Sequence, residues 1–183
     1  PWIKYVLPLI ITTDLATGRG EDITVQVTGT FPDEALLYDL AFDEGGFFDM
    51  SQVESRNKSV VLGYEVAKTI FGDDTAVGNS VKINNQNFRV IGVVTESCSR
   101  AFTDLDKSVY MPVTAAMDLY GQRFMPYVII QPDGISQNET VARVTDIMRD
   151  QHRLREGDDD DFFMETMDES VESVSQITDI LSI

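Results

Sequence analysis

The chain has 183 residues, of which 43% are hydrophobic, and it carries 31 acidic against 14 basic side chains, a formal net charge of -17. This length and apolar content support a folded domain, or two closely joined subdomains, and argue against intrinsic disorder. The negative field repels phosphate backbones and anionic lipid headgroups, which argues against a nucleic-acid-binding role.

The first part of the chain predicts a β-hairpin. Residues 6–13 and 23–30 have the composition of strands, and the second alternates strictly between apolar and polar side chains. The Gly18-Arg19-Gly20 stretch between them suits a tight connection. Because proline cannot donate a ladder hydrogen bond, Pro8 indicates either an edge strand or a later strand start.

A short helix is predicted next, followed by an irregular connection. Phe31-Pro32-Asp33-Glu34 places a proline and two acids in the first helical turn, where both are favoured. The apolar residues of this helix are Ala35, Leu36, Leu37 and Leu40. Residues 43–56 are rich in glycine and polar side chains, and we expect them to connect to a second subdomain.

The stretch 59–94 predicts a compact strand–helix–hairpin unit. Val60-Val61-Leu62 is a short β-branched run that ends at Gly63. A helix follows, with an apolar stripe and Gly72 as its left-handed cap; the stripe comprises Val66, Ala67, Ile70 and Phe71. After a turn at Gly78, two alternating runs flank the polar residues 84–87, which is typical of a β-hairpin.

The last part of the chain predicts strands and helices in alternation. Residues 96–106 lack periodicity and indicate an exposed loop. Residues 108–111 predict a strand that ends at Pro112, and Thr114 is predicted to cap a helix that ends at Gly121. A strand at 127–131, a helix capped by Ser136 and Glu139, a strand at 162–165 and a helix capped by Thr166 and Glu169 complete a β-α-β-α order. The periodicity as a whole predicts an α+β fold.

Residues with catalytic chemistry are few. The only histidine, His152, stands among arginines at a predicted helix C-terminus, which favours compensation of the helix dipole over catalysis. The single cysteine, Cys98, excludes an internal disulfide and suits a small buried residue better than a reactive thiol. We therefore predict no catalytic residue.

The acidic run at residues 156–161 is the most conspicuous local feature. It lacks the spacing of a calcium loop, so we expect a solvated loop and no metal site, although the sequence leaves cation binding open. Asp161 precedes a predicted strand, which indicates a structural role. No glycine-rich phosphate loop is present, because Gly45-Gly46 and Gly18-Arg19-Gly20 lack the required context, so we predict no cofactor-binding residue.

Three motifs together resemble a known family. V-V-L-G-x-x-V-A-x-x-I-F-G from Val60, V-G-x-x-V-x-I from Val77 and F-x-V-I-G-V from Phe88 are similar in order and spacing to the MacB-like periplasmic core domain of FtsX-like ABC transporter permeases, the type VII or mechanotransmission class. Residues 45–48, 109–112 and 161–163 extend the resemblance over most of the chain. The positions that carry it, with an implied structural role, are Gly63, Val66, Ala67, Phe71, Gly72, Gly78, Gly92, Pro112, Asp161 and Phe162.

The resemblance implies a fold of two subdomains. Residues 1–40 with 122–183 correspond to a porter-like β-α-β subdomain, and residues 41–121 correspond to an inserted, mostly β, Sabre-like subdomain. The chain begins without methionine and ends within an apolar pattern at residues 180–183. We therefore expect a segment from between the first two membrane helices of a longer permease, located in the periplasm as part of an inner-membrane protein.

The resemblance also implies a function without an active site. Such domains transmit ATP-driven conformational change to a periplasmic partner or substrate, in efflux, lipoprotein export or cell-wall regulation. ATP and Mg²⁺ are expected on a separate ATPase domain or subunit. The implied partners are a second permease in a homodimer or heterodimer, and a periplasmic adaptor, a lipoprotein or a regulator of a cell-wall enzyme. The partner-binding residues are unknown.

Two other classes of function stay open at this point. A free-standing sensor module predicts tight binding of a ligand or peptide by the isolated domain. A hydrolase predicts a pocket with carboxyl groups of perturbed pKa, and turnover that is lost when one of them is replaced.

Overall fold

The computed structural model describes residues 2–96 and 104–166. Packing divides the chain into two compact units, a larger one at Tyr5–Ile130 and a smaller one of Pro1–Lys4 with Gln131–Ile183. The strands are β1 (Ile3–Gly18), β2 (Glu21–Thr30), β3 (Phe42–Gly45), β4 (Ser59–Leu62), β5 (Ser80–Ile83), β6 (Gln86–Val94), β7 (Ser108–Pro112) and β8 (Tyr127–Pro132). The helices are α1 (Asp33–Leu37), α2 (Met50–Glu54), α3 (Tyr64–Phe71), the 3₁₀ turn η1 (Leu105–Lys107), α4 (Val113–Tyr120) and α5 (Gln137–His152).

The strand pairs of the larger unit close into a circuit. β2 pairs with β7, β7 with β4, β4 with β6, β6 with β5, β5 with β1, and β1 again with β2. The β2–β7 and β4–β6 pairs are parallel and the others are antiparallel. β3 and β8 attach outside this circuit, to β6 and β1 respectively. A sheet that closes on itself pairs its edge strands, so the core strands are hydrogen-bonded on both sides.

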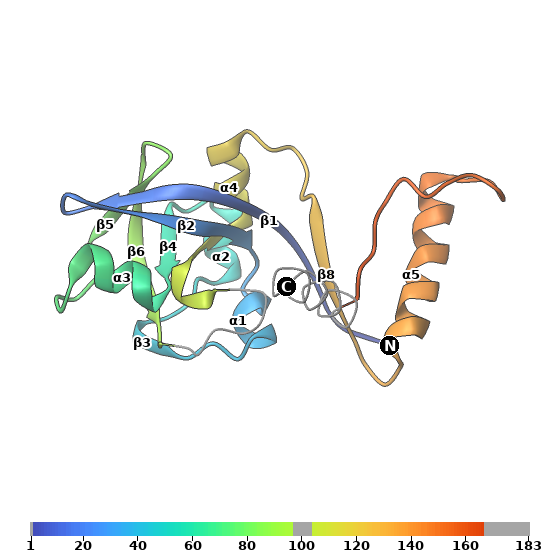
Figure 1. Ribbon diagram of the computed structural model, residues 1–183, viewed down its shortest axis with the longest axis horizontal. Coiled ribbons are helices and arrows are strands. Elements are labelled where there is room, and N and C mark those ends of the chain that lie inside the picture. The colour runs from blue at the N-terminus through green and yellow to red at the C-terminus, as the bar shows by residue number, and fades with distance from the viewer. Residues whose placement is uncertain (1, 97–103, 167–183) are drawn as a thin grey trace, which may run out of the picture. The chain divides into compact units, whose positions relative to one another are not determined.

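The β1–β2 hairpin confirms the first predicted pair of strands and is longer than predicted (Figure 1). Its pairing runs without a break from Ile10↔Gly29 to Gly18↔Glu21. Pro8 lies inside β1, which already begins at Ile3, so the proline does not delay the start of the strand. The pairing of β1 with β2 begins at Ile10, after the proline, so none of its hydrogen bonds needs an N–H at position 8.

Helices α3 and α4 pack closely on this hairpin. A Cβ atom at Gly29 would clash with the Ala116 side chain of α4, and one at Gly18 would clash with the Ile70 side chain of α3. Glycine at these two strand positions therefore brings each helix close to the strands. The largest fully buried side chains of the unit are Tyr110, Phe48, Phe88, Leu7, Leu9, Leu62, Ile83, Met111, Val25, Val27, Val60 and Val61.

The strand–helix–hairpin unit at residues 59–94 confirms the sequence pattern. α3 buries its apolar stripe and ends at Gly72, whose φ of 65° is positive as predicted, although its ψ of -123° lies outside the left-handed helical region. The β5–β6 hairpin turns at Asn84 and Asn85, with φ of 45° and 60°. Positive φ at both central residues is the geometry that two-residue hairpin turns require, and asparagine tolerates it better than most residues do.

Three local predictions were wrong. Residues 43–56 are not simply irregular, since they include the end of β3 and all of α2, which Asp49 and Gln52 cap reciprocally. Thr114 does not cap α4; Pro112 occupies that position, and the Thr114 hydroxyl donates to the Val53 carbonyl (2.5 Å). The predicted strand at 162–165 does not form: these residues are not part of a strand, and the Phe163 side chain is 85% exposed.

Several predictions lie outside the described residues. These are the last helix after Thr166, the environment of Cys98, and most of the loop at residues 96–106. The predicted capping box of α5 forms only in part: the Ser136 side chain accepts from the Glu139 amide (3.2 Å), whereas the Glu139 carboxylate accepts from Arg143 (2.6 Å). Within the described ranges, no helix is both long and apolar enough to span a bilayer.

The compact units divide the chain at other positions than the expected subdomains. The sequence placed boundaries near Leu40 and Gly121, whereas the larger unit runs from Tyr5 to Ile130. The physical reason is that β1 and β2 pair with β5 and β7, strands of the segment expected to form the inserted subdomain. Mixed α and β structure agrees with the predicted class, and the porter-like and Sabre-like assignment stays a prediction.

Candidate functional site

Gly63 lies at a point of close backbone approach in the larger unit, where β4 turns into α3. Its N–H donates to the Ser108 carbonyl (2.7 Å). A Cβ atom here would come closer than 3.0 Å to the carbonyl oxygens of Leu105 and Asp106. Both obstacles are backbone atoms of η1, so the α3 N-terminus and η1 approach each other only because position 63 has no side chain.

The other motif residues in this unit fill the core or shape turns. Val66, Ala67 and Phe71 are buried on α3. Gly78 has a φ of 90° and donates to the Val90 carbonyl (2.9 Å). Gly92 faces the Gly46 backbone across the β3–β6 pair so closely that any side chain would clash. Pro112 ends β7 and precedes α4. These positions determine packing and offer no reactive group.

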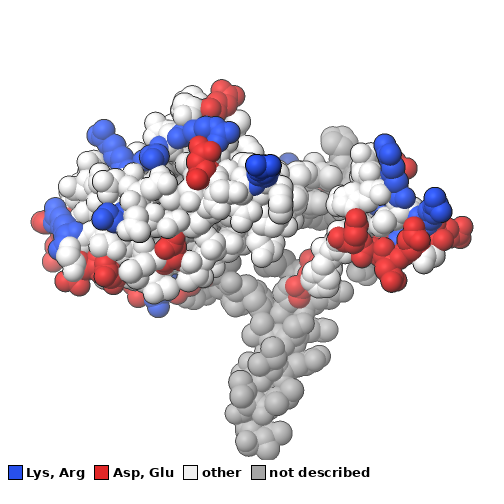
Figure 2. Space-filling view, turned by 90° about the horizontal axis from the view of Figure 1, so that it is seen from above, with Lys and Arg blue, Asp and Glu red and all other residues white. Residues whose placement is uncertain are grey.

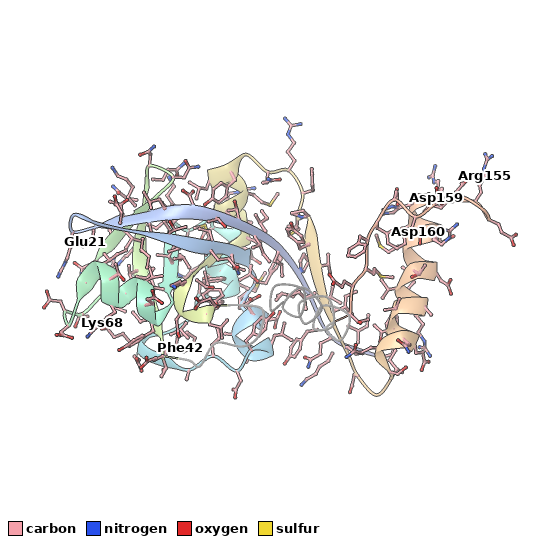
Figure 3. The ribbon with its side chains drawn as sticks, viewed as in Figure 1. Glu21, Phe42, Lys68, Arg155, Asp159 and Asp160 are labelled. Carbon is pink, nitrogen blue, oxygen red and sulfur yellow. The ribbon has the colours of Figure 1, made fainter. Side chains whose placement is uncertain are left out.

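In the smaller unit, Arg149 organises the acidic loop that follows α5. Its guanidinium forms an ion pair with Asp160 and donates to the carbonyls of Arg155 (2.8 Å) and Asp158 (3.0 Å). Figure 3 shows Arg155, Asp159 and Asp160 near the C-terminal end of α5. In the space-filling view, Asp and Glu side chains gather on this unit with Lys and Arg among them (Figure 2).

His152 and Asp161 meet in the same loop. His152 Nδ1 lies 2.7 Å from Asp161 Oδ1, and its ring meets the Phe162 ring edge-on at 5.9 Å between centroids. His152 also stands in the last turn of α5, which is the position expected for dipole compensation. The sequence did not indicate that these two motif positions, Asp161 and Phe162, would both contact the histidine.

A shallow groove of about 200 Å³ lies between β3 and α3. Glu44 lies in it, and its Oε2 accepts from the amides of Ala76 and Val77 (both 3.1 Å). Lys68, labelled on α3 in Figure 3, pairs with Asp73, and this hydrogen bond lowers the pKa of the Asp73 carboxyl. The polar groups of the groove thus hold the chain after α3 in place. Within the described residues, no cluster of His, Cys, Asp and Glu side chains is arranged to hold a metal ion.

The family assignment follows from the sequence profile of the MacB-like periplasmic core domain, which matches residues 1–147. The chain belongs to this family. The macrolide export ATP-binding/permease protein MacB of Chlorobium phaeobacteroides is 33% identical over 143 residues, 76% of this chain and 21% of that protein. The pyoverdine export ATP-binding/permease protein PvdT of Pseudomonas aeruginosa is 32% identical over 133 residues, 71% of this chain and 20% of that protein.

A solved structure shares the fold. The periplasmic region of MacB from Actinobacillus actinomycetemcomitans matches with a TM-score of 0.75 at 20% identity, over 95% of this chain and 77% of that one. The chain spans about a fifth of the length of the curated relatives it matches. The chain is an extracytoplasmic, periplasmic-type domain of a MacB-like permease. The resemblance to this family that the sequence motifs indicated is confirmed.

The sequence did not indicate that Thr30 and Glu34 of this MacB-like domain form a buried polar cluster. The Thr30 hydroxyl donates to Glu34 Oε2 (2.9 Å), and both residues are buried. Burial raises the pKa of the Glu34 carboxyl to about 7, and the Thr30 hydrogen bond partly offsets that rise. The sequence placed Glu34 with Asp33 as a dipole-stabilising acid. The i, i+4 spacing of Thr30 and Glu34 was the available signal.

Tyr110 on β7 belongs to the same cluster. Its hydroxyl is buried and has no hydrogen-bond partner among the described residues. Burial raises the pKa of this hydroxyl, and the negative charge of Glu34 raises it further. The neighbouring Ser108 hydroxyl donates to the Asp104 carbonyl (2.8 Å).

Proposed function

We propose that this MacB-like domain transmits ATP-driven conformational change of an ABC transporter to a periplasmic partner or substrate. The family match over residues 1–147 carries the proposal. Relatives named as macrolide and pyoverdine exporters support export as the process served. The chain has no glycine-rich phosphate loop, so ATP and Mg²⁺ are assigned to a separate nucleotide-binding domain or subunit, and the domain itself acts without enzymatic activity.

The packing of the larger unit supports a mechanical role. Its core strands form a closed hydrogen-bonded circuit, and glycines at 18 and 29 bring α3 and α4 against β1 and β2. Close-packed protein interiors have low compressibility and transmit strain. A displacement applied at one end of such a unit is passed on with little internal deformation.

The partners follow from the type of transporter. For an exporter, the partner is a periplasmic adaptor; a lipoprotein or a regulator of a cell-wall enzyme would serve the other branches of the family. A second permease chain, identical or different, completes a dimer in the full transporter. These assignments belong to the proposal.

The experiment is replacement of Tyr5–Ile130 by a Gly/Ser linker in the full-length permease, with ATP hydrolysis and export measured in proteoliposomes. We expect ATP hydrolysis to continue and export to fall to background. Export that persists without the domain would contradict the proposal.

Two point variants test whether export depends on the tight packing of the domain or only on its presence. Gly29→Ala presses on the Ala116 side chain, whereas Gly46→Ala has no atom within 4 Å of the new Cβ. We expect Gly29→Ala to reduce export per ATP hydrolysed and Gly46→Ala to leave it unchanged. Equal export by both variants would contradict a role for rigid packing.

A further inference from the structure

The short helix α1 is attached to the larger unit through an acid. Glu34 is its only buried residue, with 4% of its surface exposed, whereas Leu36 on the same helix is 65% exposed. A helix of this length is not stable by itself in water, so its position depends on contacts with its neighbours. Of the leucines that the sequence indicated as the apolar face, Leu36 is exposed, and Leu40, which packs against the core, lies beyond the end of α1.

Among the described residues, no positively charged group contributes to the pKa of Glu34. The Thr30 hydroxyl is its hydrogen-bond donor. The titratable groups whose charges act on Tyr110 of β7 are Glu34 itself, Tyr38 from the end of α1 and Asp106 from η1. None of the ion pairs among the described residues includes Glu34. The site therefore holds a neutral carboxyl more easily than a carboxylate.

A proton on Glu34 also improves its hydrogen bonding. A protonated carboxyl is a donor as well as an acceptor, whereas an ionised one only accepts. The Thr30 hydroxyl, 2.9 Å from Glu34 Oε2, can accept from a protonated carboxyl as well as donate to an ionised one. Ionisation removes this possibility and places a charge in an apolar environment.

We propose that α1 is a proton-controlled latch: protonated Glu34 holds the helix on the sheet, and ionised Glu34 releases it together with the segment that leads to β3. Release exposes Leu40 and Phe42, which pack against the core in the closed state. The latch is independent of the proposed transmission of force, and it makes the exposure of an apolar surface on this domain dependent on the surrounding pH.

The direction of the effect follows from the two protonation equilibria. The pKa of Glu34 is about 7 in the closed state, and its ordinary value of 4.5 applies when the latch is open. Because the closed state binds the proton more tightly, opening becomes more favourable as pH rises from 4.5 to about 7. Above that pH, the equilibrium constant for opening no longer changes with pH. Each pKa unit is worth a factor of ten, so the full change is up to about 300-fold.

Amide hydrogen exchange of the 183-residue chain tests the latch. The reporters are the Tyr38 amide, which donates to the Glu34 carbonyl (3.1 Å), and the Leu40 amide, which donates to the Ala35 carbonyl (2.9 Å). After correction for intrinsic exchange, we expect their protection to fall by about 80-fold between pH 4.5 and pH 7, because each of these pH values lies at the midpoint of one titration. The Gly72 amide at the end of α3 is the internal reference and stays level.

Two variants distinguish the latch from a general effect of pH. Glu34→Gln mimics the protonated acid, so the protection of the Tyr38 and Leu40 amides is expected to be the same at every pH between 4.5 and 7. Asp33→Asn changes the adjacent, exposed acid of the same helix and is expected to keep the wild-type dependence.

Three results would overturn the latch. They are level protection in the wild type, pH dependence that survives in Glu34→Gln, and an equal fall at Gly72. If Glu34→Gln does not fold, a carbon NMR titration of the wild-type Glu34 carboxyl decides: a midpoint near 7 supports the latch, and a midpoint near 4.5 overturns it.

Discussion

Replacement of Gly63 by alanine tests whether close backbone approach holds the larger unit together. Gly63 has φ of -66° and ψ of 157°, a conformation that alanine adopts without strain. The effect of the change therefore comes from the new Cβ atom alone. That atom would lie closer than 3.0 Å to the carbonyl oxygens of Leu105 and Asp106.

The size of the effect is set by two opposing contributions. Relaxed contacts between carbon and a carbonyl oxygen are about 3.3 Å or longer, so η1 or the start of α3 must move. Because both obstacles are backbone atoms, we take the upper end of overpacking costs, about 3 kcal/mol. Alanine restricts the unfolded chain and returns about 0.4–1 kcal/mol. The net loss in the free energy of unfolding is about 2 kcal/mol, or about 4–8 °C in Tm for a chain of this size.

Urea and thermal unfolding of the variant measure this loss. Gly46→Ala is the matched control, because its new Cβ has no atom within 4 Å, and its stability should equal or slightly exceed that of the wild type. If Gly63→Ala is as stable as Gly46→Ala, the contact between η1 and the α3 N-terminus does not hold the unit together.

Three further changes probe the core, the groove and the smaller unit. Phe88→Ala removes a side chain that is 1% exposed and should lower the free energy of unfolding by about 3–5 kcal/mol in urea titrations, whereas Phe163→Ala, at 85% exposure, should change it by less than about 0.5 kcal/mol. Glu44→Ala leaves two backbone amides without their acceptor and should cost about 1–3 kcal/mol; a loss below that range would show that water replaces the carboxylate. Ser136→Ala removes the cap of α5 and should cost about 1 kcal/mol, seen as faster exchange of the Glu139 amide; unchanged exchange would refute the capping role.

The sequence determined those elements whose hydrogen bonds close within a few residues. The stripe and terminal glycine of α3, the asparagine turn between β5 and β6, and the Ser136 cap of α5 are local patterns, and the structure reproduces each. The spacing of the same motifs was also sufficient to recognise the family.

The tertiary structure decided which of these elements pair and which polar groups become buried. The pattern at 162–165 suits a strand, but a strand exists only with a partner, and these residues pair with none of the strands that the structure describes. The hairpin at the start of the chain pairs with β5 and β7, which come much later in the sequence. Glu34 looks like an ordinary acid of a first helical turn, and only the packing of α1 in the larger unit makes it a buried carboxyl. Contacts between residues far apart in sequence determine burial and strand partners, and periodicity along one chain carries no record of them.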